Sequence, residues 1–176
     1  MTEQDPAHRL LGLLADELHA ADIPGWVLPP VGDAPAQLVV PIGDGDAPEE
    51  PTVLVCFLPG HDDPAVLQYM TVLDHDVPLA AVPTVARLLH LLNTNLVVTG
   101  FEVGETFSSV VFRHNQAVSV DPLDPAVVAW TLTMVAHAVV HYDALVAAAC
   151  AGTEMAELSR SFAGIQAAIF APDAPE

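Results

Sequence analysis

Residues 82–113 read VPTVARLLHLLNTNLVVTGFEVGETFSSVVFR, and this stretch decides the fold class. Its first part repeats apolar residues every three or four positions, which predicts a helix over residues 83–96. Its second part contains two β-type runs, residues 97–103 and 106–113, separated by a Gly-Glu pair that is a hairpin signal. A helix that leads into an antiparallel hairpin is typical of an α+β protein and not of a doubly wound parallel sheet.

Helix and strand signals continue on both sides of this stretch. Asp124 followed by Pro125 is the strongest helix start in the chain, because a capping side chain precedes a proline in the first turn. Gly152 and Thr153 then end that helix and begin the last one. The expected order is helix, three strands, helix, two strands, long helix and final helix, over residues 5–21, 37–42, 52–58, 66–73, 83–96, 97–103, 106–113, 124–149 and 153–170.

These elements predict a single α+β domain that holds residues 1–176. It has five strands in the order α-β-β-β-α-β-β-α, followed by an extra helix. The core is expected over about residues 5–149, with the extra helix at 153–170 and a tail at 171–176. Hydrophobic residues make up 52% of the chain, which is sufficient for one core of this size.

Cysteine usage and hydropathy predict the compartment. Cys56 and Cys150 lie in apolar segments, so we expect small core residues in a reducing environment and not a disulfide. The amino terminus lacks the pattern of a signal peptide. No stretch is expected to reach the roughly 20 apolar residues that span a bilayer. We therefore predict a cytoplasmic protein without a membrane partner.

The charge of the chain is strongly acidic. Twenty-three acidic residues face four arginines and no lysine, which gives a formal net charge of −19. Such a surface repels nucleic-acid phosphates and anionic lipid and attracts basic protein segments, although a saline host is another explanation for the composition. Residues 1–76 hold 14 of the acids and one arginine, so the acidity belongs mainly to the first part of the chain.

Two kinds of histidine cluster could carry chemistry. His137 and His141 have the i, i+4 spacing of a zinc site, but such sites need three or four protein ligands and no further ligand is expected on that side of the helix. The triplets at residues 61–63 (His-Asp-Asp) and 74–76 (Asp-His-Asp) place carboxylates beside imidazoles, yet each lies near a proline and is typical of a capped turn. Nucleophile elbows and phosphate-binding glycine loops are absent from the sequence. We therefore predict no catalytic residue, metal site or cofactor.

The long helix predicted at residues 124–149 has apolar residues on both sides. Val127, Trp130, Met134 and Leu145 lie away from its main apolar stripe, and tryptophan and methionine are favoured at protein contacts. These four residues are the candidate protein-contact residues. The alternative is that the last helix covers them, through Leu158, Phe162 and Ile165.

Three blocks of sequence carry a family resemblance. They are Leu91-Leu92-Asn93-Thr94-Asn95, Val98-Thr99-Gly100-Phe101-Glu102-Val103 and Val110-Val111-Phe112-Arg113. With the element order, they make the chain similar to the YbjN family and, through it, to the type III secretion chaperone fold. The resemblance covers residues 64–149 by pattern and 5–149 by element order. It implies a five-stranded antiparallel sheet with helices packed on it, frequent homodimerisation and a role in binding other proteins, without catalytic residues.

Together these observations predict a non-enzymatic protein-binding domain, chaperone-like or regulatory, that acts through an apolar helix face or groove within an acidic surface. Its expected partners are a protein with basic segments and a second copy of the chain. One alternative is a small metal-dependent enzyme that uses His61, Asp62 and His75, with His137 and His141 as further ligands. A second alternative is a structural subunit whose apolar helix faces are oligomer contacts.

Overall fold

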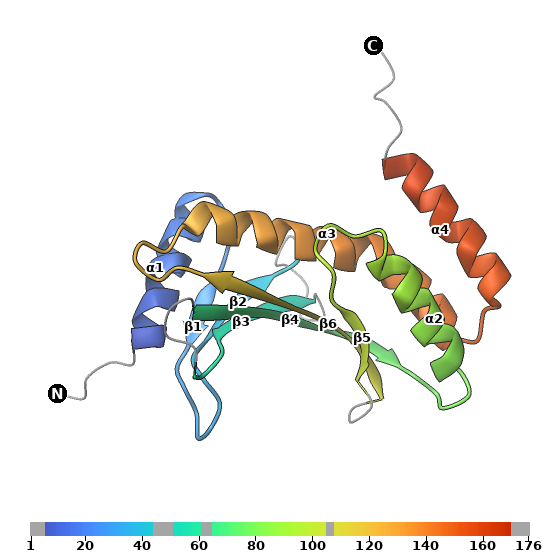
Figure 1. The fold of residues 1–176 in the computed structure, drawn as a ribbon, viewed down its shortest axis with the longest axis horizontal. Coiled ribbons are helices and arrows are strands. Elements are labelled where there is room, and N and C mark those ends of the chain that lie inside the picture. The colour runs from blue at the N-terminus through green and yellow to red at the C-terminus, as the bar shows by residue number, and fades with distance from the viewer. Residues whose placement is uncertain (1–5, 44–50, 61–64, 105–107, 170–176) are drawn as a thin grey trace, which may run out of the picture.

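The computed structural model describes residues 6–43, 51–60, 65–104 and 108–169, and it shows a two-layer α+β fold (Figure 1). The helices are α1 (Pro6–Ala20), α2 (Val82–Asn93), α3 (Pro125–Cys150) and α4 (Met155–Ile169). The strands are β1 (Trp26–Leu28), β2 (Gln37–Pro41), β3 (Thr52–Phe57), β4 (Ala65–Asp76), β5 (Phe101–Gly104) and β6 (Ser109–Val118). The strands form one antiparallel sheet in the spatial order β1-β2-β3-β4-β6-β5.

The α+β class is confirmed, but the prediction of five strands is wrong because the sheet has six. The missed strand is β1, which has only three residues and lies between Pro24 and Pro29. It pairs with β2 in a register that places Val27 opposite Leu38. Trp26 and Val27 have high β propensity, but a run of three residues is too short to show alternation in the sequence, so the strand becomes visible only through its pairing with β2.

The hairpin of β5 and β6 is confirmed, although its strands are displaced along the chain. β5 begins at Phe101 and not at Val97, whose side chain is exposed in the connection from α2. β6 continues to Val118, five residues beyond the predicted end. Its polar residues remain in the sheet because they pair with β4, where the amide of Gln68 donates a hydrogen bond to Asn115 at 3.0 Å.

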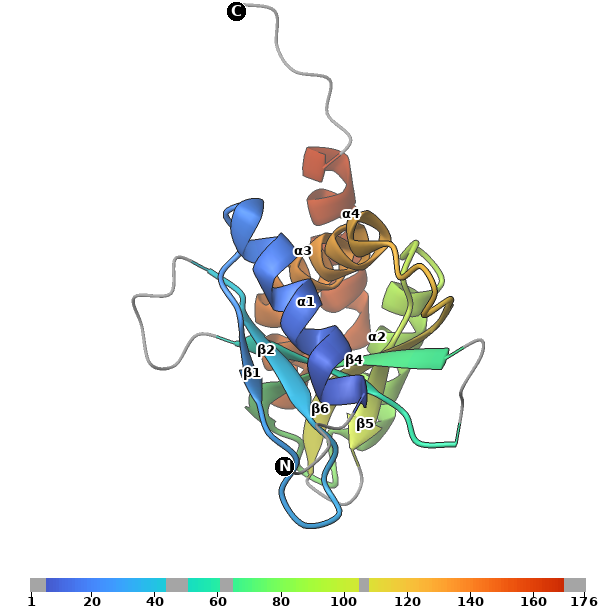
Figure 2. The same ribbon diagram turned by 90° about the vertical axis from the view of Figure 1, so that its left-hand side faces the viewer.

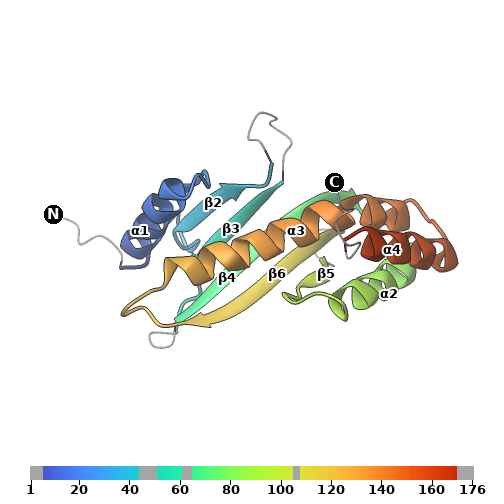
Figure 3. The same ribbon diagram turned by 90° about the horizontal axis from the view of Figure 1, so that it is seen from above.

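The helices share one face of the sheet between them, as Figure 2 shows end-on and Figure 3 from above. α1 packs on β1, β2 and β3, α3 contacts β3, β4 and β6, and α2 contacts β5. α4 packs on α2 and α3. One cluster of buried hydrophobic residues extends from Leu11 in α1 to Phe162 in α4, so α4 belongs to the same core as the rest of the described chain.

Alternation along β4 shows which face of the sheet the helices cover. Leu67, Tyr69 and Leu73 are buried in the core, whereas Met70 and Val72 between them are more exposed. Successive side chains of a strand point to opposite faces, so Met70 and Val72 lie on the face without helices.

The ends of α3 explain its length. The carboxylate of Asp124 accepts a hydrogen bond from the backbone N–H of Ala126 at 2.9 Å, which confirms the predicted cap. At the other end, Gly152 has a φ of 92°, and Thr153 N–H bonds back to the carbonyl of Ala148 at 3.0 Å. Positive φ favours glycine, so the helix ends where the sequence predicted.

Asn93, at the end of α2, ties this helix to the start of β5. Its side-chain amide nitrogen donates to the carbonyl of Phe101 at 2.8 Å. Its side-chain oxygen accepts from the backbone N–H of Phe101 at 3.0 Å and from that of Gly100 at 3.2 Å. One side chain therefore satisfies three backbone groups at the start of a strand that has no described neighbour on its outer side.

Replacing Asn93 by alanine is expected to lower the free energy of unfolding by about 2–3 kcal/mol, because part-buried backbone groups lose their partners. Asn95→Ala is the matched control, since the Asn95 side chain makes only exposed bonds within the same turn. That variant should lose less than about 1 kcal/mol. Urea unfolding of both variants measures the difference, and equal losses would contradict the role given to Asn93.

Candidate functional site

The outer face of α3 carries a continuous exposed surface without a formal charge. We call it the α3 stripe. It contains no aspartate, glutamate, lysine or arginine, and its members recur at helical spacing along five turns of the helix. They are Val127, Trp130, Thr133, His137, Val140, His141 and Ala144. Figure 3 shows that no described element lies over the N-terminal half of this helix.

The predicted contact residues differ in their exposure. Trp130 is 51% exposed, and Val127 is exposed beside it. Met134 is half-buried and packs against the core, where it lines a small cavity with Tyr142. Leu145 is only 4% exposed, so its assignment as a contact residue is wrong, because it faces the core at the end of α3 that lies beside α2 and α4.

The last helix covers only part of α3. Leu158 and Phe162 are buried, and the ring of Phe162 lies 5.9 Å from that of Tyr142. Ile165 is half-buried against the same cluster. Trp130 stays exposed in spite of these contacts, so the alternative in which α4 covers it is wrong.

His137 and His141 form a stacked pair in the middle of the α3 stripe. Their ring centroids are 3.8 Å apart with an interplanar angle of 21°, and Nδ1 of His141 donates to the carbonyl oxygen of His137 at 2.9 Å. Desolvation, followed by the neighbouring His141, lowers the pKa of His137. A lowered pKa favours the neutral imidazole, so at neutral pH this position adds no charge to the stripe.

No third metal ligand lies beside these two histidines among the described residues. No group of three or more histidine, cysteine, aspartate or glutamate side chains lies close enough together to hold an ion in that part of the chain. The stacked rings also present parallel faces, whereas metal ligands direct their lone pairs at one point. His61 and Asp62 lie outside the described residues.

The triplet at residues 74–76 is not a capped turn, as the sequence indicated, but the end of β4. Nε2 of His75 lies 2.8 Å from a carboxylate oxygen of Asp143 on α3. This pair joins residues 68 positions apart, and no pattern in the sequence predicted it. Ser109 on β6 lies opposite Asp76, at the end of the same strand pair. Its buried hydroxyl has no hydrogen-bond partner among the described residues, so Ser109, His75 and Asp143 do not form a hydrogen-bonded triad.

Both cysteines are free and buried, as predicted. Desolvation by burial raises the pKa of the Cys56 thiol. Desolvation also raises the pKa of Cys150, against a smaller opposing effect of a backbone hydrogen bond. A raised pKa favours the thiol over the reactive thiolate at both positions.

Helix α3 is long and apolar enough to cross a membrane by length and composition alone, which differs from the expectation drawn from the sequence. Within its most apolar window, 44% of the residues are buried in the fold. The core helix of a soluble protein passes the same test, so location and membrane contact stay predictions.

The chain matches no protein-family model, no curated protein sequence and no solved structure. The resemblance to the YbjN family therefore stays a prediction, and the geometry of the described residues is the main support for a function.

Proposed function

We propose that this protein is a non-enzymatic protein-binding domain, chaperone-like or regulatory, whose contact surface is the α3 stripe. One observation carries the proposal: a molecule with a net charge of −19 leaves an uncharged stripe with a half-exposed tryptophan uncovered along its longest helix. Exposed surface of this kind, with a tryptophan and two valines accessible and no formal charge between them, is typical of protein contacts. Tryptophan is among the residues that contribute most to binding energy at interfaces.

The net charge of the molecule favours one kind of partner. A protein with basic segments near an apolar surface would be attracted to the acidic molecule and then held by the stripe. A second copy of the chain is also an expected partner. The stripe holds no carboxylate, so the stripes of two molecules could pack together without direct repulsion between acidic side chains. The resemblance to the YbjN family supports the same expectation of a homodimer.

Replacing Trp130 by glutamate is expected to weaken self-association about 30-fold, because an interface tryptophan contributes about 2 kcal/mol and the new charge would be buried. Sedimentation of the full chain across a dilution series measures this change. Leu79→Glu is the matched control, since it adds the same charge at an exposed leucine outside the stripe. A monomer–dimer equilibrium that responds equally to both substitutions would contradict the role of the stripe.

Capture of other proteins is tested with the same variants. The wild-type chain and Leu79→Glu should retain the same partners from the native cell, identified by mass spectrometry, and Trp130→Glu should lose them. Retention of partners should fall as salt increases, because the Debye length is only about 8 Å at physiological ionic strength. Partner capture that is independent of salt would contradict the electrostatic part of the proposal.

A further inference from the structure

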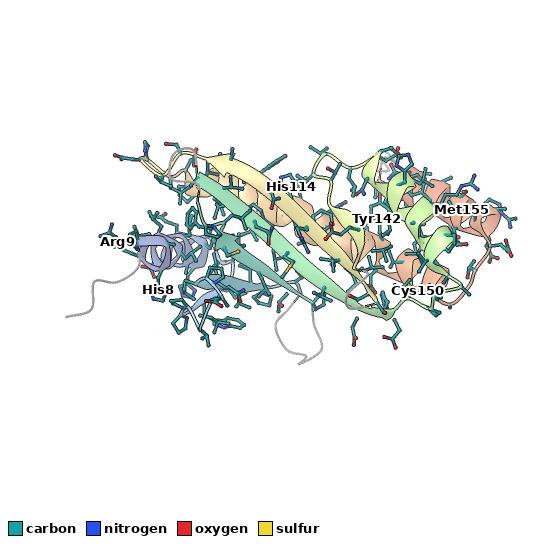
Figure 4. All side chains as sticks on the ribbon, turned by 60° about the horizontal axis from the view of Figure 1, so that its bottom comes forward. His8, Arg9, His114, Tyr142, Cys150 and Met155 are labelled. Atoms are coloured by element: carbon teal, nitrogen blue, oxygen red, sulfur yellow. The ribbon has the colours of Figure 1, made fainter. Side chains whose placement is uncertain are left out.

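The face of the sheet opposite the helices holds a groove. Figure 4 shows this face, with α3 behind the sheet. The groove is a cavity of about 600 Å³ over β4, β5 and β6, and we call it the sheet groove. It is lined by Met70, Val72, Leu73, Asp74, His75, Asp76, Glu102, Val103, Gly104, Ser109, Val111 and Arg113.

The floor of the sheet groove is apolar because of the strand register. Val72 on β4 lies opposite Val111 on β6, and Met70 lies one step further along β4 on the same face. Val111 is buried although no described helix covers this side, whereas Val72 is 52% exposed. A floor of aliphatic side chains and methionine would bury an apolar side chain of a ligand.

The rim of the sheet groove is acidic. Asp74, Asp76 and Glu102 stand around it with one arginine, Arg113. Nη2 of Arg113 lies 3.0 Å from a carboxylate oxygen of Glu102, so this cation is already paired. Asp74 and Asp76 are exposed and make no ion pair with a described residue, which leaves an unbalanced negative charge at one end of the groove.

A buried polar group also lines the groove. The hydroxyl of Ser109 has no hydrogen-bond partner among the described residues, although its oxygen is buried. A buried hydroxyl without a partner costs free energy, which a polar group of a ligand in the groove would recover.

We propose that the sheet groove binds an extended, basic peptide segment of a partner protein. An apolar side chain of the segment lies on Met70, Val72 and Val111, and a lysine or arginine beside it faces Asp74 and Asp76. The charge of the rim selects this occupant over nucleic acid or an acidic segment, because both would bring more negative charge to unpaired carboxylates. This site lies on the opposite face of the sheet from α3, so it does not depend on the α3 stripe.

The first test uses two synthetic peptides of matched length, acetyl-Lys-Leu-Lys-Leu-Lys-amide and acetyl-Glu-Leu-Glu-Leu-Glu-amide. Each is titrated into the full-length, ¹⁵N-labelled protein, and backbone amide signals are followed by NMR. The lysine peptide should shift the signals of Met70, Val72 and Val111, and its affinity should fall with increasing salt. Equal binding of the glutamate peptide, or shifts confined to α3, would overturn the proposal.

The second test uses a pair of matched variants. Val72→Lys fills the groove and adds a positive charge, so affinity for the lysine peptide should fall about tenfold or more, which corresponds to about 1.4 kcal/mol. Val31→Lys makes the same change at an exposed valine that lies outside both the sheet groove and the α3 stripe, and it should leave affinity within about twofold of the wild type. Equal losses in the two variants would mean that only net charge matters, which would overturn the proposal.

Two further arms keep the test independent of folding and of the α3 stripe. The double variant Asp74→Asn, Asp76→Asn changes exposed side chains, so it should fold normally, bind the lysine peptide several-fold more weakly and show a flatter salt dependence. Trp130→Glu should bind the lysine peptide as the wild type does. Competition by spermidine at the affinity of the peptide would instead identify a site for small cations and overturn the proposal of a peptide groove.

Discussion

Replacing Gly100 by alanine is expected to lower the free energy of unfolding by about 3 kcal/mol, because the added methyl group would overlap the backbone of β6. A Cβ at this position would lie 2.5 Å from the carbonyl oxygen of Arg113 and 2.8 Å from its carbonyl carbon. It would also lie 3.0 Å from the ring of Phe112. The backbone of β6 cannot move away without breaking the hydrogen bond from Arg113 N–H to the Gly100 carbonyl, which is 2.8 Å long.

Urea unfolding followed by circular dichroism measures this loss as a lower transition midpoint. Gly12→Ala is the control, because a Cβ there meets nothing within 4 Å and the residue lies inside α1. Alanine is favoured over glycine in a helix by about 0.5–1 kcal/mol, so this variant should gain stability. The two Gly-to-Ala changes should therefore have opposite signs, and a neutral Gly100→Ala would contradict the close approach of the connection after α2 to β6.

Replacing Phe112 by alanine is expected to cost about 3–5 kcal/mol. Phe112 is fully buried in β6, between the sheet and the helices. Its ring meets that of Phe101 edge to face, with centroids 4.9 Å apart and an interplanar angle of 88°. Truncation would leave a cavity and remove this ring pair, which joins β5 and β6 in the core.

Phe112→Leu is the matched variant, since leucine keeps most of the volume but not the ring. It should lose about 1–1.5 kcal/mol, which separates the cost of the cavity from that of the ring contact. Both variants are measured by chemical unfolding at a common temperature. A Phe112→Ala variant as stable as Phe112→Leu would mean that the surrounding core collapses into the space, contrary to the tight packing around this ring.

Elements with strong local signals could be predicted from the sequence. α3 was expected over residues 124–149 and is observed as Pro125–Cys150, because Asp124 and Gly152 fix its ends through their own chemistry. β1 could not be predicted, since three residues between prolines form a strand only when β2 lies beside them. The end of β6 was missed for a related reason, because its polar residues are held in the sheet by partners on β4.

In the candidate site, too, the features that depend on neighbouring elements could not be predicted from the sequence. Val127 and Leu145 are 18 residues apart, which is five helical turns, so they lie on the same side of α3. Sequence reasoning therefore grouped them, yet one is exposed and the other is buried, because α2 and α4 lie only beside the C-terminal half of the helix. The contact of His75 with Asp143 could not be predicted from the sequence either, since it depends on how α3 packs across β4.

The hydrogen bonds of Asn93 have a consequence for aggregation. The outer strands of a sheet can template the addition of strands from other molecules, which leads to fibres. Here one outer strand, β1, is three residues long between prolines, and the other, β5, has the N–H and carbonyl of Phe101 occupied by the Asn93 amide. Each described edge therefore offers only a short run of free backbone groups, which disfavours growth of the sheet by added strands.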